Sequence, residues 1–238
     1  MAPPLPAEPA PGDFVDATIT AITALIRDND LKPGDRLPAE AKLSADLQVS
    51  RTVVREALRS LAALRLVTLG AGKRAAVAKI DDGAMALMFD HGVVTEQIDI
   101  LQIYDVRRTL EARTATLAAL RRTEAEAQAI LQHAHAMQTH FATPETVMEH
   151  DLALHLAIAR ASRNPLFALI LGSFRNITRR TWPVGWECRD DDAARRAMND
   201  LHIALAEAIT AGDPRNAARL MEQHFDESIK NLLSAGVI

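Results

Sequence analysis

The sequence predicts a mainly α-helical protein in two parts, a winged helix-turn-helix followed by an antiparallel bundle of helices. Alanine and leucine are abundant and strand-like runs are few, which favours helix. Near the amino terminus, two short helical patterns flank a tight break and precede a hairpin-like segment. Beyond residue 80, apolar residues keep a helical spacing almost to the end of the chain, interrupted by short turns that contain proline or glycine.

A proline- and alanine-rich segment, residues 1–12, opens the chain, and its composition predicts a disordered lead. A first helix is expected over residues 13–28, because apolar side chains recur there at helical spacing. Its apolar stripe consists of Val15, Ile19, Ile22 and Ile26. The sequence Lys-Pro-Gly-Asp at residues 32–35 predicts a turn that ends the helix.

Residues 37–66 hold the two short helical patterns, separated by a break at Gln48 and Val49. Ser50 predicts the start of the second helix, because its hydroxyl can accept a hydrogen bond from an unpaired first-turn N–H. One face of this helix is apolar and another is basic, and they consist of Val54, Leu58 and Leu61, and of Arg51, Arg55 and Arg59. An arginine face suits the DNA major groove, where guanidinium groups reach guanine edges or phosphates. On spacing alone, a solvated basic surface is an equally good interpretation.

A short hairpin is expected next, with strands at residues 66–69 and 75–78 and a glycine-containing turn at residues 70–73. Three helices followed by a hairpin with a basic tip make a winged helix-turn-helix. We expect this DNA-binding domain to comprise residues 13–80.

The distribution of charge agrees with contact to a polyanion by this part of the chain alone. Residues 1–80 carry 11 basic and 9 acidic side chains, a net charge of +2, whereas residues 81–238 carry 16 and 22, a net charge of −6. Residues 50–80 contain seven basic side chains and one acidic side chain. A basic segment beside an acidic remainder indicates a nucleic-acid partner for the first part only.

The remainder, residues 81–238, is expected to form a domain of antiparallel helices joined by short loops. The expected helices are residues 83–91, 95–122, 123–140, 144–162, 165–182, 190–211 and 214–234. Breaks are indicated at Pro144, at Pro165, at residues 183–185 and at residues 212–214. Asp213 is the expected N-cap of the last helix, since Pro214 suits a first helical position.

Cysteine usage and hydropathy bear on the compartment. A single cysteine, Cys188, cannot form an internal disulfide, and the sequence shows neither a signal peptide nor an apolar run of membrane-spanning length. We therefore expect a protein of the reducing cytoplasm without a membrane partner.

Four residues of the second part have side chains of the kinds that bind metals. Asp151 and His155 are four residues apart and project from one face of a helix, whereas His202 and His224 lie on later helices. Three imidazoles and one carboxylate suit Zn²⁺, with Ni²⁺, Fe²⁺ or Mn²⁺ as alternatives. Spacing alone does not show that three helices converge, and a histidine taken alone is more often structural. His150 points about 100° away from Asp151 and is interpreted as a bystander.

Arg107 and Arg108 lie near the start of a bundle helix. Their spacing from Asp105 and Glu111 predicts helical ion pairs, an interpretation that requires no ligand.

Both parts resemble a known family. The sequence LKPGDRLPAEAKLSADLQVSRTVVREALRSL, at residues 31–61, resembles the amino-terminal signature of the GntR superfamily of bacterial transcription regulators. The second part resembles the FCD effector domain of the FadR subfamily. The matching segments are YDVRRTLEARTATLAA at 104–119, HDLALHLAIARASRNPL at 150–166 and HIALAEAITAGDPRNAARLMEQH at 202–224. The resemblance covers nearly the whole chain from about residue 13.

The resemblance implies DNA contacts through Ser50, Arg51 and Arg55, and through Gly72 at the tip of the wing. Further candidates for contact with DNA are Lys42, Thr52, Arg59 and Lys73. One basic position of the family is Ala41 here, so that contact is lost unless the adjacent lysine replaces it. The resemblance also implies a homodimer that reads a palindromic double-stranded operator with two recognition helices.

For the second part, the resemblance implies that Asp151, His155, His202 and His224 bind a divalent transition metal, because these positions match the FCD metal-binding pattern. Open coordination positions would then anchor a small carboxylate or sugar acid as effector. The family places a pocket arginine at Arg107, which would clamp an effector carboxylate through two hydrogen bonds. Candidates to line or cover the pocket are Asn164 and the segment at residues 182–186.

These inferences predict a transcription repressor whose DNA affinity depends on an effector bound in the bundle. A metal-dependent enzyme is the alternative, since a His/Asp site with open positions could activate water. However, no carboxylate is placed as a general base in the manner of His-Glu-x-x-His, and an enzyme leaves the winged domain unexplained, so we expect no enzyme. A purely architectural DNA-binding protein is a third interpretation and predicts no effector pocket.

Overall fold

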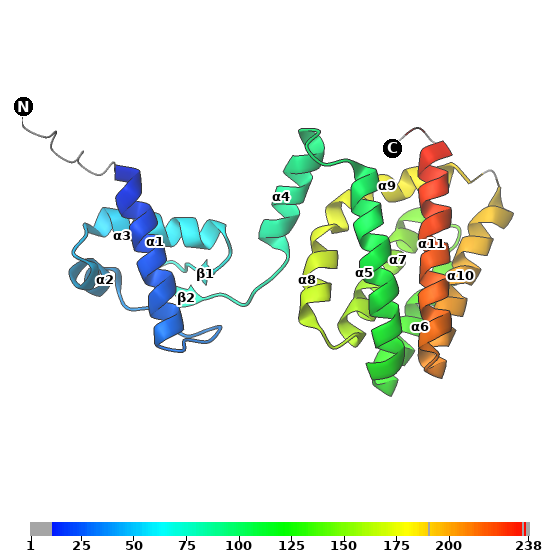
Figure 1. Ribbon diagram of the computed structural model, residues 1–238, viewed down its shortest axis with the longest axis horizontal. Helices are drawn as coiled ribbons and strands as arrows, with labels where there is room; N and C mark the ends of the chain where they lie inside the picture. The colour runs from blue at the N-terminus through cyan, green and yellow to red at the C-terminus, as the bar shows by residue number, and fades with distance from the viewer. Residues whose placement is uncertain (1–10, 190, 235, 237–238) are drawn as a thin grey trace, which may run out of the picture. The chain divides into compact units, whose positions relative to one another are not determined.

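The computed structural model describes residues 11–189, 191–234 and 236. The chain divides into two compact units, one reaching to Ala84 and one starting at Met85. The predicted fold class is confirmed, with a winged helix-turn-helix in the first unit and a bundle of helices in the second (Figure 1). The lead predicted at residues 1–12 lies outside the described residues as far as residue 10, and the first helix already begins at Pro11. None of the described helices is both long enough and apolar enough to cross a bilayer.

The first unit consists of three helices and a two-stranded antiparallel sheet. Its elements are α1 (Pro11–Asp28), α2 (Glu40–Leu47), α3 (Arg51–Ala63), β1 (Val67–Thr68) and β2 (Ala76–Val77). Val67 lies opposite Val77, and Arg36 adds a single antiparallel bridge to Ala76. The strands are shorter than the four residues expected for each, but the hairpin is present.

A small apolar core holds the first unit together. The fully buried side chains include Ile22, Leu37, Leu43, Val54 and Leu61, so the predicted stripes of the first and third helices do face inward. The predicted break between α2 and α3 is made by Gln48, whose φ of 56° lies in the left-handed region and whose N–H bonds to the carbonyl of Ser44. This turn fixes the direction in which α3 leaves α2.

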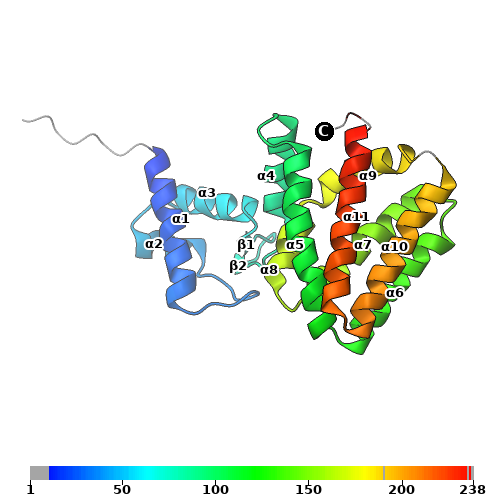
Figure 2. The ribbon, with the colours of Figure 1, turned by 45° about the vertical axis from the view of Figure 1, so that its right-hand side comes forward.

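The second unit is a bundle of helices with a large apolar core and a smaller one beside it. Its elements are α4 (Gly83–Val94), α5 (Ile100–Arg121), α6 (Glu124–Thr139), α7 (Pro144–Ala161), α8 (Pro165–Ser173), α9 (Arg175–Glu187), α10 (Asp192–Ala211) and α11 (Pro214–Ser234). In both views α5 and α11 lie side by side, and α6 packs against both α7 and α10 (Figures 1 and 2). As predicted, the Asp213 side chain accepts a hydrogen bond from the N–H of Asn216, 3.0 Å away, and so caps α11.

The helix predicted at residues 165–182 was wrong in two respects. The chain turns at Phe174 between α8 and α9, directly after Gly172 and Ser173, and this break was not predicted. Conversely, Pro183, expected to break a helix, lies inside α9. The buried face of α9 continues through the proline, from Ile177 to Trp186, and this packing offsets the hydrogen bond that proline cannot donate.

The helix predicted at residues 95–122 begins later, at Ile100, and α4 extends to Val94. Asp99 sets the start of α5, because its carboxylate accepts from the N–H of Leu101 while its own N–H donates to Gln102. This reciprocal capping box is visible in the sequence as an acidic residue followed three positions later by glutamine, and it was overlooked.

Candidate metal centre and DNA-contacting helix

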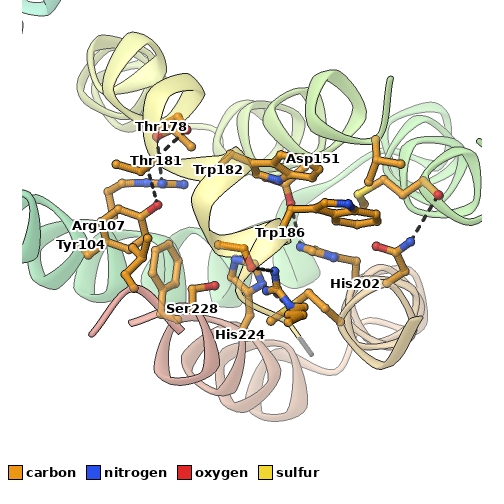
Figure 3. Close-up of a pocket in the computed structure, with 18 residues that line it drawn as sticks. Tyr104, Arg107, Asp151, Thr178, Thr181, Trp182, Trp186, His202, His224 and Ser228 are labelled. Atoms are coloured by element: carbon orange, nitrogen blue, oxygen red, sulfur yellow. Dashed lines mark hydrogen bonds and ion pairs between the residues drawn. The ribbon is translucent and has the colours of Figure 1, made fainter. Parts of the chain in front are cut away.

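Three helices of the bundle bring the predicted metal ligands together. His155 of α7, His202 of α10 and His224 of α11 are all buried, and one ring nitrogen from each lies within 4.8 Å of the others. Asp151, one turn before His155 on α7, has its Oδ1 atom 2.9 Å from Nε2 of His202 and 3.8 Å from Nε2 of His155. The convergence that spacing alone did not establish is therefore present. Figure 3 shows Asp151, His202 and His224 of this set.

The donor atoms of this cluster are suited to a divalent cation. Nε2 of His155 and Nδ1 of His202 are buried and have no hydrogen-bond partner among the described residues, and Nε2 of His202 has only the carboxylate of Asp151 beside it. Unpaired polar atoms are costly in a protein interior, so a site that leaves several of them converging fits a bound ion. Imidazole nitrogens with one carboxylate are ligands that Zn²⁺ and neighbouring transition metals accept.

The electrostatics of Asp151 and His224 also suit a cation, whereas Glu111 outweighs burial and raises the pKa of His155. Burial alone would raise the pKa of Asp151, but the adjacent imidazoles of His202, His155 and His224 outweigh it and hold this pKa well below its usual range. Burial, together with His202 and His155, keeps the pKa of His224 well below its ordinary value. An ionised carboxylate and a neutral imidazole are the protonation states that bind a metal.

Glu111 of α5 links the cluster to Arg107. One carboxylate oxygen accepts a hydrogen bond from Nε of Arg107 at 2.8 Å, and the other contacts Nδ1 of His155. Burial would raise the pKa of Glu111, but Arg107 and His155 keep it lowered. A carboxylate that holds Nδ1 fixes the ring orientation and leaves Nε2 for a metal. The sequence indicated Glu111 only as an ion-pair partner, because its contact with His155 depends on how α5 packs against α7.

A cavity borders the cluster on the side of α9. It is lined by side chains that include Arg107, Asp151, His202 and His224, the last three being candidate ligands. The Arg107 guanidinium donates to Oγ1 of Thr178 at 3.0 Å and lies 5.1 Å from the ring centre of Phe225. Arg107 thus has both of the predicted features, the helical ion pair with Glu111 and a position in the cavity.

Aromatic side chains of the segment at residues 182–186, a candidate to line or cover the pocket, form part of the wall. Trp182 and Trp186 stack with ring centres 5.1 Å apart and an interplanar angle of 16°, and both line the cavity (Figure 3). Tyr104 and Ser228 also line it, as does Arg189, whose pKa is lowered by burial.

Two residues near the site have other positions or partners than predicted. Asn164 is not among the residues that line the cavity, and its side chain accepts from the N–H of Leu166 at 3.1 Å as the N-cap of α8. Arg108 does not pair with Asp105 or Glu111 but forms two hydrogen bonds with Asp226 of α11, at 2.7 and 3.2 Å. Contacts between helices replaced the local pairing that i+3 spacing suggested.

In the first unit, α3 has the two faces that the sequence predicts. Val54, Leu58 and Leu61 are buried, whereas Arg51 and Arg55 are exposed on the other side, as is Arg59. The Ser50 hydroxyl accepts from the N–H of Val53 at 3.3 Å and caps the helix. The exposed Thr52 lies in the first turn of α3, next to Arg51.

The basic side chains of this unit differ in their ion pairs. Arg55 bonds to Glu40 of α2 at 2.8 Å, and this contact lowers the pKa of Glu40. Arg59 pairs with Glu56 at 2.7 Å and Lys42 with Asp46 at 3.1 Å, as solvated surface charges do. Among the described residues, Arg51 has no such partner.

The backbone at the wing tip adopts a conformation that glycine allows. Gly72 has a φ of 66°, in the left-handed region that L side chains rarely adopt, and no atom lies near the place where a Cβ would point. The adjacent Lys73 is exposed and its N–H donates to the carbonyl of Gly70 at 3.0 Å. The tip therefore offers an unobstructed backbone beside a positive charge.

Comparisons with known proteins match both units. Residues 102–227 match the model described as FCD domain, and residues 15–77 match the model described as bacterial regulatory proteins, gntR family. The HTH-type transcriptional regulator LutR of Bacillus subtilis is 30% identical over 213 residues, which cover 88% of this chain and 96% of that protein. The fatty acid metabolism regulator protein of Shewanella amazonensis is 33% identical over 191 residues, covering 77% of this chain and 75% of that protein.

A solved structure described as Streptococcus agalactiae GntR is similar in fold, with a TM-score of 0.60 and 24% identity, over 90% of this chain and 97% of that one. The matched families and relatives are transcriptional regulators and not enzymes. The comparisons therefore do not support the alternative interpretation as a metal-dependent enzyme.

Proposed function

This chain belongs to the GntR family of bacterial regulatory proteins and carries an FCD domain, and on that premise we propose that it is a repressor controlled by a small organic or sugar acid. In this proposal the winged unit binds DNA and the helical unit binds the acid beside a divalent metal, Zn²⁺ in the first instance. The chain acts as a homodimer on a palindromic operator, since two recognition helices related by a two-fold axis read two equivalent half-sites.

The winged unit contacts DNA through α3 and the wing. Arg51 is exposed in the first turn of α3 and is free to reach a base edge or a phosphate. Arg55 is held by Glu40, which fixes the direction of its guanidinium group. Ser50 and Thr52 lie at the start of α3 and Lys42 in the first turn of α2. Gly72 lets the wing backbone approach a phosphate. Arg59 and Lys73 contribute positive charge.

The helical unit binds the metal through Asp151, His155, His202 and His224. A bound divalent ion supplies Lewis acidity and open coordination positions for an oxygen ligand. Arg107 offers a second contact for the same ligand, because its guanidinium lines the cavity and can donate to a carboxylate. Trp182 and Trp186 cover the cavity and keep water away from the ion pair that forms there.

Arg107, Glu111 and His155 couple the effector to the ligand set. Glu111 bonds both Arg107 and His155, so a carboxylate that draws Arg107 toward the cavity changes the pairing that orients His155. An effector changes DNA affinity only if it binds two arrangements of the dimer unequally, and a buried ion-pair network with two pairing states provides such a difference.

The observation that carries this proposal is the buried convergence of three imidazoles with unpartnered nitrogens next to a cavity that contains a buried arginine. Elemental analysis of the purified chain tests it. We expect the double variant His155→Ala/His202→Ala to lose one ion per chain relative to wild type. Replacing the exposed His135 is the matched control and should leave the metal content unchanged. Equal metal in wild type and the double variant would refute the site.

A further inference from the structure

A second group of histidines lies between α6 and α7, outside the ligand set described above. Nδ1 of His133 on α6 is 3.2 Å from Nδ1 of His150 on α7. The ring of His140, at the end of α6, lies nearly parallel to the ring of His150, with an interplanar angle of 11° and centres 5.9 Å apart. His133 and His150 are half-buried and His140 is exposed, so the group is open to solvent on one side.

Helix geometry explains how three imidazoles come together here. His133 and His140 are seven residues apart, about two turns, so both lie on one face of the α6 segment. That face packs against α7, where His150 meets it. His150 directly precedes Asp151, and consecutive residues point about 100° apart around a helix. One side of α7 therefore serves the buried cluster and another serves this group.

The separation of the two nitrogens suits a shared ion. Two imidazole nitrogens bound to one tetrahedral Zn²⁺ at about 2.0–2.1 Å each lie about 3.3 Å apart. A direct hydrogen bond between the rings is the competing explanation, since one Nδ1–H could donate to the other nitrogen. Such a bond would explain why His133 and His150 lie close together. It would not explain why the ring of His140 lies beside His150.

We propose that His133, His140 and His150 form a second metal site, for an imidazole-preferring divalent ion such as Zn²⁺, Ni²⁺ or Cu²⁺. His133 and His150 are already placed as ligands, and rotation of the exposed His140 side chain supplies the third. Water completes the coordination on the open side. The ion joins the end of α6 to α7 and so stabilises the bundle from outside its core.

Titration of the chelator-treated full-length protein with ZnCl₂ in a calorimeter tests this inference. We expect His133→Ala/His150→Ala to bind one Zn²⁺ ion fewer per chain than wild type. We also expect His140→Ala, a change at an exposed side chain, to weaken the same ion at least tenfold. His135→Ala, on the same helix but outside the group, should match wild type. Circular dichroism checks that each variant is folded.

The same comparison in the His155→Ala/His202→Ala background separates the two sites. The His155→Ala/His202→Ala variant should still bind the ion that His133 and His150 hold. Loss of the buried site and loss of the second site therefore give different stoichiometries. An unchanged stoichiometry and affinity in His133→Ala/His150→Ala would overturn the inference. Saturation only at millimolar ZnCl₂ would overturn it as well, because it would show adventitious binding.

Discussion

Replacing Glu111 with glutamine removes one charge from a buried network and should lower the stability of the helical unit by several kcal/mol. Glu111 is 1% exposed and Arg107 is 6% exposed, and the two are joined at 2.8 Å. Removing one partner of a buried ion pair costs about 3–5 kcal/mol, because the remaining charge stays buried without compensation. Glutamine keeps the size of the side chain, so a cavity does not contribute to this loss.

Urea unfolding followed by tryptophan fluorescence measures the effect. Both tryptophans of the chain, Trp182 and Trp186, lie in α9, so the signal reports the helical unit alone. With a slope of about 2–3 kcal/mol per molar urea, the midpoint of the metal-free protein should fall by about 1–2.5 M. Asp226→Asn, which breaks the largely exposed pair with Arg108, is the matched control and should shift it by less than about 0.5 M.

Glu111→Gln should also weaken metal binding, by about 10- to 100-fold, since a carboxylate that orients a ligating imidazole contributes that much. A midpoint equal to that of Asp226→Asn, with unchanged Zn²⁺ affinity, would refute the claim that Glu111 supports both Arg107 and His155.

Three further predictions concern the wing, the recognition helix and pH. Arg51→Ala should weaken operator binding about tenfold or more in a gel shift at fixed salt. Arg59→Ala should weaken it less, because the Arg59 side chain is already paired with Glu56. Equal effects of the two substitutions would contradict this distinction. Gly72→Ala should weaken DNA binding without a clash, because only the left-handed φ opposes it, at about 1–2 kcal/mol; wild-type affinity would show that the wing backbone is not used. The lowered pKa of His224 means that, below about pH 6.5, the unfolded chain takes up a proton that the folded metal-free chain does not, so the contribution of His224 to stability should fall as pH falls. The raised pKa of His155 acts in the opposite direction, and the comparison with a His224 variant isolates the first contribution. His224→Gln should flatten this dependence of the urea midpoint between pH 7 and 5, and an unchanged slope would contradict the assignment.

The features predicted well from the sequence are those with a local cause. Ser50 begins α3 because its hydroxyl caps that helix, and Asp213 with Pro214 begins α11 for a similar reason. The apolar stripe of α3 is buried as its 3.6-residue spacing requires. Such signals depend only on neighbours along one element.

Two of the missed features are local, namely the capping box at Asp99 and the break after Gly172. The others depend on contacts between elements. Pro183 stays helical because the face around it is packed. Glu111 contacts His155, 44 positions away, and His150 contacts His133 across two helices. For the metal ligands, single-helix spacing placed Asp151 beside His155, but the family resemblance was needed to predict that α10 and α11 would bring theirs to the same point.

The most direct test of effector control is the DNA affinity of the Zn²⁺-loaded chain, measured by fluorescence anisotropy on promoter DNA from its neighbouring genes. Small hydroxy, dicarboxylic and sugar acids are first screened by the change in fluorescence of Trp182 and Trp186, and the strongest is then added to the anisotropy titration. Allosteric coupling of about 1–3 kcal/mol corresponds to a change in affinity of about 5- to 150-fold. We expect a change in this range for wild type and none for His155→Ala/His202→Ala. An acid that binds in the helical unit yet leaves the DNA affinity of wild type unchanged would contradict the account.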